Sequence, residues 1–161
     1  LNLLAAHPEL QPALQQRAAQ GQTTVLTPHE AEAGRLLGCH YSAVHGHRLH
    51  AAQQLAEKYQ AIVLLKGCGS IIATPQGEVF INPTGTPALA TGGSGDVLTG
   101  LITGLLAQAD SSTQAVWAAV LAAVFVHGQA AQDLGFSRGL AAGELIPAAR
   151  AALHKLESTM I

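Results

Sequence analysis

Apolar and polar positions along the chain change spacing several times, and each change predicts a different element. Residues 1–19 carry apolar side chains at loose helical spacing, interrupted by two prolines, and predict a helical opening. Residues 23–27 are rich in β-branched side chains and end at a proline, which is typical of a short strand. Helical spacing returns at residues 30–37 and stops at Gly38, a predicted C-terminal cap.

The middle of the chain predicts one further helix and three strands. A helix capped by Ser42 and ending near Tyr59 is expected to turn these side chains inward: Val44, Leu49, Ala52, Leu55 and Ala56. Residues 61–65 form a continuous apolar run, typical of a strand buried on both faces of a parallel sheet. Residues 70–74 and 78–81 flank a Pro-Gln-Gly turn and therefore predict a β-hairpin.

The last third of the chain predicts three helices, at residues 96–107, 113–131 and 142–156. Strands that alternate with helices indicate an α/β layered fold with an added hairpin. A length of 161 residues suits a single globular domain.

Composition excludes some partners and favours others. Hydrophobic residues make up 48% of the chain and charged residues 11%, so we expect buried surface on several sides or against partner subunits. The formal net charge of −2 gives no basic footprint for nucleic acid, and six aromatic residues in all offer no platform for stacking bases. Nucleic acid is therefore not expected as a partner.

The ends, the cysteines and the longest apolar run bear on cellular context. Residues 115–126 are apolar but shorter than the ~20 residues of a membrane span, which predicts a core helix and no membrane. No basic segment opens the chain as in a signal peptide, and Cys39 and Cys68 lack metal spacing and are interpreted as reduced thiols. We therefore expect a cytoplasmic protein, and the start at Leu1 suggests a piece of a longer chain.

The stretch ATGGSGDVLTGL, residues 90–101, is the strongest candidate for chemistry. It lacks the Gly-Lys-Ser/Thr ending of a Walker A loop and the spacing of a dinucleotide fingerprint. Its small residues instead predict an anion hole for a phosphate at Gly92, Gly93, Ser94 and Gly95, where main-chain N–H groups meet the N-terminus of a helix. Asp96 beside that hole would orient or deprotonate a hydroxyl that attacks the phosphoryl group, although a plain structural turn remains an alternative.

The other candidate residues also have purely structural interpretations. His29 follows a strand and could be a helix cap as well as a ligand contact. Lys66 ends an apolar strand, where a lysine commonly reaches for water, although the ends of strands are also where α/β sheets bind ligands. A metal site at the four histidines between residues 40 and 50 lacks carboxylate or cysteine partners, and an ordinary helix surface is the simpler interpretation.

Three ordered motifs carry a resemblance to a known family. They are TPHEAE at residues 27–32, VLLKG at residues 63–67 and NPTGTPALATGGSGD at residues 82–96, followed by FSRGLAAGELIP at residues 136–147. Together they resemble the ADP- or ATP-dependent NAD(P)H-hydrate dehydratases, the C-terminal YjeF-type domain of the ribokinase-like superfamily. The resemblance implies a ribokinase-like α/β/α sandwich with a mostly parallel central sheet, of which this chain would form the C-terminal part.

The resemblance also implies an activity and roles for individual residues. The family restores hydrated NADH and NADPH with ADP or ATP, by phosphorylation of the hydrate hydroxyl and elimination of phosphate. Asp96 would be the catalytic base and, with His29, would bind the hydrate. The nucleotide would lie along Lys66, Gly67, Cys68, Gly69, Ser70 and Gly95. Asn82 and Glu32 would lie near the phosphates and Mg²⁺.

Further expectations follow from the same resemblance. Family domains carry an additional N-terminal half, and the full-length protein could also include an N-terminal epimerase domain. A homo-oligomer is expected, with a tetramer as one form. Two other functions stay open: a small-molecule kinase of the same fold, of the hydroxymethylpyrimidine or hydroxyethylthiazole type, and a nucleotide-binding assembly module without turnover.

Overall fold

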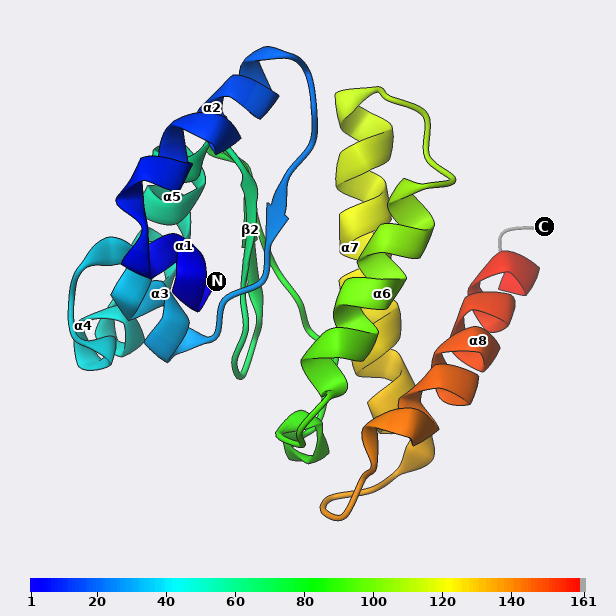
Figure 1. The fold of residues 1–161 in the computed structure, drawn as a ribbon. Coiled ribbons are helices and arrows are strands. Elements are labelled where there is room, and N and C mark those ends of the chain that lie inside the picture. The colour runs from blue at the N-terminus through cyan, green and yellow to red at the C-terminus, as the bar shows by residue number, and fades with distance from the viewer. Residues whose placement is uncertain (160–161) are drawn as a thin grey trace. The chain divides into compact units, whose positions relative to one another are not determined.

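The computed structural model describes residues 1–159, and the chain divides into two compact units, residues 1–81 and 82–161. Each unit has its own hydrophobic core, and Figure 1 traces the helices and strands of both. That the two units form a single domain stays a prediction.

The first unit consists of short helices packed against a small sheet. Its helical elements are α1 (Asn2–Ala6), the 3₁₀ helix η1 (Pro8–Leu10), α2 (Gln11–Ala19), α3 (Glu30–Leu37), α4 (Tyr41–Gly46) and α5 (Arg48–Tyr59). Gly38 ends α3 in the left-handed conformation (φ 73°), as the sequence predicted. The core is formed mainly by α3, α5 and the strands, with Leu55 and Val63 among its fully buried side chains.

The sheet in the first unit has four strands in the order β1-β2-β3-β4. They are β1 (Val25–Leu26), β2 (Ile62–Leu65), β3 (Ile71–Ala73) and β4 (Val79–Ile81). β1 and β2 are parallel, while β2–β3 and β3–β4 are antiparallel, so the predicted hairpin is confirmed. One of the three described strand pairings is parallel and two are antiparallel, so in the described residues the expected mostly parallel sheet is limited to the β1–β2 pair. All four residues of β2 are buried, as its apolar run predicted.

The prediction of a single helix between Ser42 and Tyr59 is wrong, because one helix ends at Gly46 and the next begins at Arg48. His47 has non-helical angles (φ −138°, ψ 46°) and ends one helix before the next begins. The cap of α4 is His40, whose ring accepts a hydrogen bond from the Ser42 amide. Leu49, which was expected to face inward, is 48% exposed.

The second unit contains three long helices that lie alongside one another (Figure 1). They are α6 (Ser94–Leu106), α7 (Thr113–Leu134) and α8 (Ala142–Thr159), preceded by the 3₁₀ helix η2 (Pro87–Leu89). All three predicted helices are present, each within a few residues of its expected ends. The core of this unit includes buried alanines of α7 and α8 together with Val126 and Leu145, which are fully buried.

By length and composition, α7 is the described helix that could cross a membrane. Core helices of soluble proteins pass the same test. Eight residues of α7 are buried, including the polar His127. This burial matches the core helix that the sequence predicted.

Candidate nucleotide site

The carboxyl ends of β1 and β2 bring two candidate residues together in the first unit. His29 and Lys66 form a parallel bridge directly after the two strands. The Lys66 amide donates to the Pro28 carbonyl at 2.8 Å, which extends the pairing past β2. Parallel strands place their carboxyl ends at one sheet edge, and α/β sheets bind ligands at such edges.

His29 also caps α3. The two interpretations of this residue, helix cap and ligand contact, do not exclude each other, because the cap uses Nδ1 of the ring. Its Nδ1 accepts a hydrogen bond from the Glu32 amide at 3.3 Å, and the Glu32 carboxylate accepts one from the His29 amide at 3.0 Å. This reciprocal pair is a capping box. Nε2 of the ring also lies 3.4 Å from Oε2 of Glu32, but the His29 side chain is 52% exposed, so part of the ring is accessible to a ligand.

The loop after Lys66 contains the remaining nucleotide candidates of the first unit. Gly67 (φ 155°) and Gly69 (φ 63°) have positive φ angles, which glycine adopts readily. The Ser70 hydroxyl closes the loop by donating to the Gly67 carbonyl at 3.3 Å. Cys68 is a free, exposed cysteine, in agreement with the expected reduced thiol.

In the second unit, the glycine loop leads directly into α6. Gly93 is the N-cap residue in the left-handed conformation (φ 88°), and its carbonyl accepts from the amides of Asp96 and Val97 at 3.0 and 3.1 Å. The N–H groups of Gly92, Gly93 and Gly95 have no hydrogen-bond acceptor among the described residues, whereas the Ser94 amide, which was also predicted to form the anion hole, donates to the Thr91 carbonyl at 3.4 Å. Three free N–H groups at the positive end of a helix are the arrangement that binds an anion.

Ser94 is fixed from two sides, one of which the sequence did not indicate. Its hydroxyl donates to the Leu89 carbonyl at 2.7 Å, and its own carbonyl lies 3.0 Å from Nε2 of His127 on α7. Both side chains are buried, at 9% and 6% exposure. His127 was missed because its partner lies 33 residues away in the sequence.

A second contact anchors the preceding segment to α7. The Thr84 hydroxyl donates to the Phe125 carbonyl at 2.9 Å, and a Cβ at Gly128 would lie 2.7 Å from the Thr84 carbonyl carbon. Only glycine therefore fits at position 128 without movement of the backbone. An isolated glycine inside an apolar helix was the available sequence signal for this close approach.

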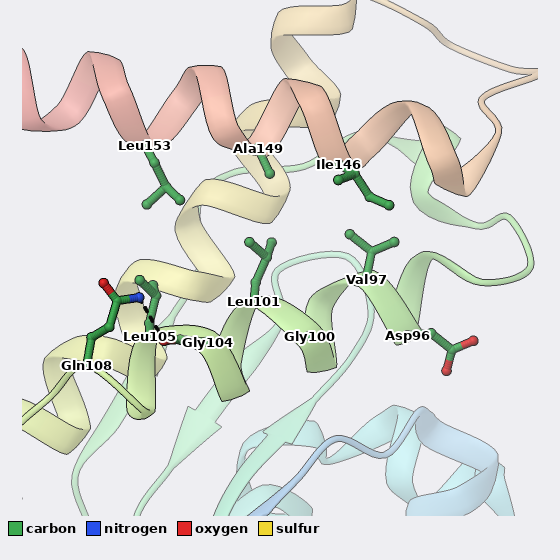
Figure 2. A pocket seen from close by; sticks show the side chains of 10 residues that line it. All are labelled: Asp96, Val97, Gly100, Leu101, Gly104, Leu105, Gln108, Ile146, Ala149 and Leu153. Carbon is green, nitrogen blue, oxygen red and sulfur yellow. Dashed lines mark hydrogen bonds between the residues drawn. The ribbon is translucent and has the colours of Figure 1, made fainter.

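Asp96 is exposed on the first turn of α6, and its carboxylate points away from α8 (Figure 2). On the α8 side, an apolar groove of about 500 Å³ runs between the two helices. Its lining residues are Asp96, Val97, Gly100, Leu101, Gly104, Leu105, Gln108, Ile146, Ala149 and Leu153. A Cβ at Gly100 or Gly104 would meet nothing within 4 Å, so these two glycines leave open space on this side of α6.

The proposed magnesium residues differ in how well they fit a metal. Asn82 is buried, its amide donates to the Thr84 carbonyl at 3.0 Å, and its Oδ1 lies 3.1 Å from the Thr84 hydroxyl oxygen. Oε2 of Glu32 is occupied by the capping box, which leaves Oε1 as the oxygen for a metal. Among the described residues no group of three or more His, Cys, Asp or Glu could hold a metal. Glu32 fits Mg²⁺ that takes its remaining ligands from phosphates and water.

The candidate residues thus fall into two sets. His29, Glu32, Lys66 and residues 67–70 belong to the first unit, whereas Asn82 and residues 92–96 belong to the second. In the first set, His29 lies beside both Lys66 and Glu32, and in the second, residues 92–96 form one loop and helix turn while Asn82 is bonded to Thr84. That the two sets bind one nucleotide and one hydrate stays a prediction.

Similarity to solved structures defines the class of protein. A Bacillus subtilis ADP/ATP-dependent NAD(P)H-hydrate dehydratase, co-crystallised with ATP and Mg²⁺, matches with a TM-score of 0.76 and 34% identity over 83% of this chain and 48% of that one. A ribokinase-like superfamily protein from Enterococcus faecalis matches with a TM-score of 0.64 and 26% identity over 89% of this chain and 50% of that one. The predicted ribokinase-like α/β fold class is therefore confirmed.

The family follows from the sequence comparisons. The family model for NAD(P)H-hydrate dehydratase matches residues 1–149, and the chain belongs to this family. An ADP-dependent (S)-NAD(P)H-hydrate dehydratase of Neisseria meningitidis is 41% identical over 84% of this chain and 46% of its own length. A bifunctional NAD(P)H-hydrate repair enzyme of Moorella thermoacetica is 44% identical over 83% of this chain and 25% of its own length. The chain therefore spans half or less of these relatives.

Proposed function

We propose that this chain is the C-terminal portion of an enzyme that dehydrates hydrated NADH and NADPH in a reaction driven by ADP or ATP. The family match over residues 1–149 is the observation that carries the proposal. The named activity of the Neisseria meningitidis relative supports the same substrates and the use of ADP. The ATP and Mg²⁺ in the Bacillus subtilis crystals support a nucleotide and metal in this fold.

The proposed reaction has two steps. Asp96 accepts the proton of the hydrate hydroxyl while that oxygen attacks the terminal phosphorus of the nucleotide, and the shortened nucleotide leaves. The carbon–oxygen bond then breaks with loss of phosphate, and a proton leaves the adjacent ring carbon, which restores the double bond. The overall change is removal of water from the hydrate and hydrolysis of one phosphoanhydride.

The second unit supplies the phosphoryl chemistry in this proposal. The unpaired N–H groups of Gly92, Gly93 and Gly95 would hold the transferring phosphoryl group and stabilise the charge that develops on it. Asp96 extends from the same helix turn, and its exposed carboxylate is accessible to a substrate hydroxyl. The buried bonds of Ser94 to Leu89 and His127 would keep this turn rigid.

The first unit would bind the rest of both ligands. Lys66 and the loop Gly67-Cys68-Gly69-Ser70 would lie along the nucleotide, and the exposed edge of His29 would contact the hydrate. Glu32 would hold Mg²⁺, which neutralises phosphate charge when it is bound. Asn82 would act near the phosphates through the segment that it braces with Thr84.

Assembly and context belong to the same proposal. A homo-oligomer in the cytoplasm, of which a tetramer is one form, would cover part of the apolar surface. The bifunctional relatives support a fusion to a second repair domain in the full-length protein.

The substitution Asp96→Asn in the full-length protein tests the proposed role. Asparagine keeps the shape of the side chain but cannot take a proton, so turnover is expected to fall by at least ~10²-fold. Nucleotide affinity, measured by calorimetry, is expected to change little, because Asp96 addresses the hydroxyl rather than the nucleotide. Equal turnover in the variant and the parent enzyme would contradict the assignment.

A further inference from the structure

Arg48 is the first residue of α5, where a cation is disfavoured by the helix dipole. Its contacts explain its presence there. The guanidinium donates through Nη1 to the Cys68 carbonyl and through Nη2, at 3.1 Å, to the Gly69 carbonyl. Arg48 therefore spans two successive peptide groups in the middle of the loop proposed to bind the nucleotide.

Glu30 holds the guanidinium in place from the opposite direction. Its Oε1 lies 3.1 Å from Nε of Arg48, an ion pair in which the N–H is not aligned for a hydrogen bond. Its Oε2 lies 2.8 Å from Nδ1 of the His45 ring. The side chains of Arg48 and Glu30 are 18% and 24% exposed, so water screens the pair less than an ordinary surface salt bridge.

The direction of the two carbonyls determines the direction of the neighbouring N–H groups. The described residues contain no cis peptide bond, and in a trans peptide the carbonyl and the N–H of one plane point in opposite directions. When the carbonyls of Cys68 and Gly69 point at Arg48, the N–H groups of Gly69 and Ser70 point away from it. Neither N–H has an acceptor among the described residues.

The absence of a side chain at Gly67 leaves room for the Arg48 guanidinium. A Cβ at position 67 would lie 2.6 Å from Nη2 of Arg48, so a side chain there would displace the guanidinium. Glycine at this position thus serves the loop's contact with Arg48 as well as its backbone angles.

We propose that Arg48, held by Glu30, is a positioning residue that presents the N–H groups of Gly69 and Ser70 to the nucleotide. This inference rests on the proposed function, because it assigns the nucleotide to the loop. Without Arg48 the loop would have to be ordered on binding, and ordering one or two residues weakens affinity about tenfold or more. Arg48 touches neither ligand in this account, and its effect passes through the loop.

The test is the affinity of the full-length protein for ADP and for ATP, measured by calorimetry without the hydrate. Arg48→Ala is expected to bind nucleotide at least about tenfold more weakly than the parent. Arg48→Lys keeps the charge but cannot span both carbonyls and Glu30, so we expect it to resemble Arg48→Ala. Glu30→Gln, which leaves the loop contacts in place, should show a smaller loss.

Lys58→Ala is the matched control. Lys58 lies on the same helix and donates to the Leu36 carbonyl at 2.7 Å, away from the loop. The substitution should reduce stability without reducing nucleotide affinity. In steady-state assays, Arg48→Ala should raise the KM for nucleotide and leave the KM for hydrate unchanged, a division that general destabilisation would not produce.

Two outcomes would overturn the inference, and they differ from failure of the proposed function. Parent-like nucleotide affinity in Arg48→Ala would show that the loop needs no positioning by this residue. Parent-like affinity in Arg48→Lys with loss in Arg48→Ala would show that charge, not geometry, is the contribution. If the parent protein itself binds neither nucleotide, the proposed function fails, and this inference fails with it.

Discussion

Gly93 caps α6 and Gly100 lies within it, yet the structure predicts opposite effects when each is replaced by alanine. Gly93 has a φ of 88°, and a Cβ there would lie 3.1 Å from Cβ of Ala142 on α8. Gly100 has helical geometry, and a Cβ at this position would meet nothing within 4 Å. Glycine is therefore required at position 93, whereas position 100 can accept a larger side chain.

The magnitudes follow from these two environments. A side chain forced into the left-handed region costs about 1–2 kcal/mol. The crowding against Ala142 adds to this, since overpacking costs about 1–3 kcal/mol. We expect Gly93→Ala to lower the free energy of unfolding by roughly 2–5 kcal/mol. Gly100→Ala should raise it by about 0.5–1 kcal/mol, because alanine favours an exposed helix interior over glycine.

Urea denaturation followed by circular dichroism measures both changes. With a slope of about 1–3 kcal/mol/M, Gly93→Ala should shift the midpoint down by roughly 1–2 M, and Gly100→Ala should shift it up slightly. Midpoints that move in the same direction for the two variants would refute the reasoning from φ and local space.

Two further stability predictions concern α7 and α5. Gly128→Ala should destabilise the protein by about 2 kcal/mol or more, because its Cβ would lie 2.7 Å from a backbone atom of Thr84 that cannot easily move; a parent-like melting temperature would contradict this. Burial raises the pKa of Tyr59 above its ordinary value of 10.0, so the folded state holds this proton more tightly than the unfolded state. Its contribution to stability should be complete below pH 10.0 and be lost as the pH rises through the raised pKa. Urea midpoints measured against pH should therefore fall as the pH rises above 10.0, and Tyr59→Phe should remove the part of this fall that Tyr59 causes. A pH profile that is the same in the variant and the parent would exclude Tyr59 as its source.

Much of the local structure could be predicted from spacing in the sequence. The buried run before Lys66 became β2, the Pro-Gln-Gly turn became a hairpin, and Gly38 ended α3. These features depend on neighbours within a few residues, so the pattern contains the information. The break at His47 was missed because helical spacing continues on both sides of it, and Gly46 alone does not specify a break.

Some parts of the candidate site could be predicted from the sequence and others could not. The glycine loop and Asp96 are evident from composition and from the helix that follows. The supports of that loop are not, because His127 and Thr84 act on residues 33 and 41 positions away. Arg48 looks like an ordinary surface residue in the sequence, and only the folded chain shows it bonded to the carbonyls of Cys68 and Gly69.

The proposed function assigns this chain to a nucleotide-driven dehydratase of hydrated nicotinamide cofactors. The direct measurement is absorbance at about 340 nm, where reduced nicotinamide absorbs, when the full-length protein meets hydrated NADH with ADP or ATP, together with the phosphate released. We expect the absorbance to recover only when the nucleotide is present, with one phosphate released for each cofactor restored. No recovery, with phosphorylation of a pyrimidine or thiazole alcohol supplied instead, would contradict it and identify a kinase of the same fold.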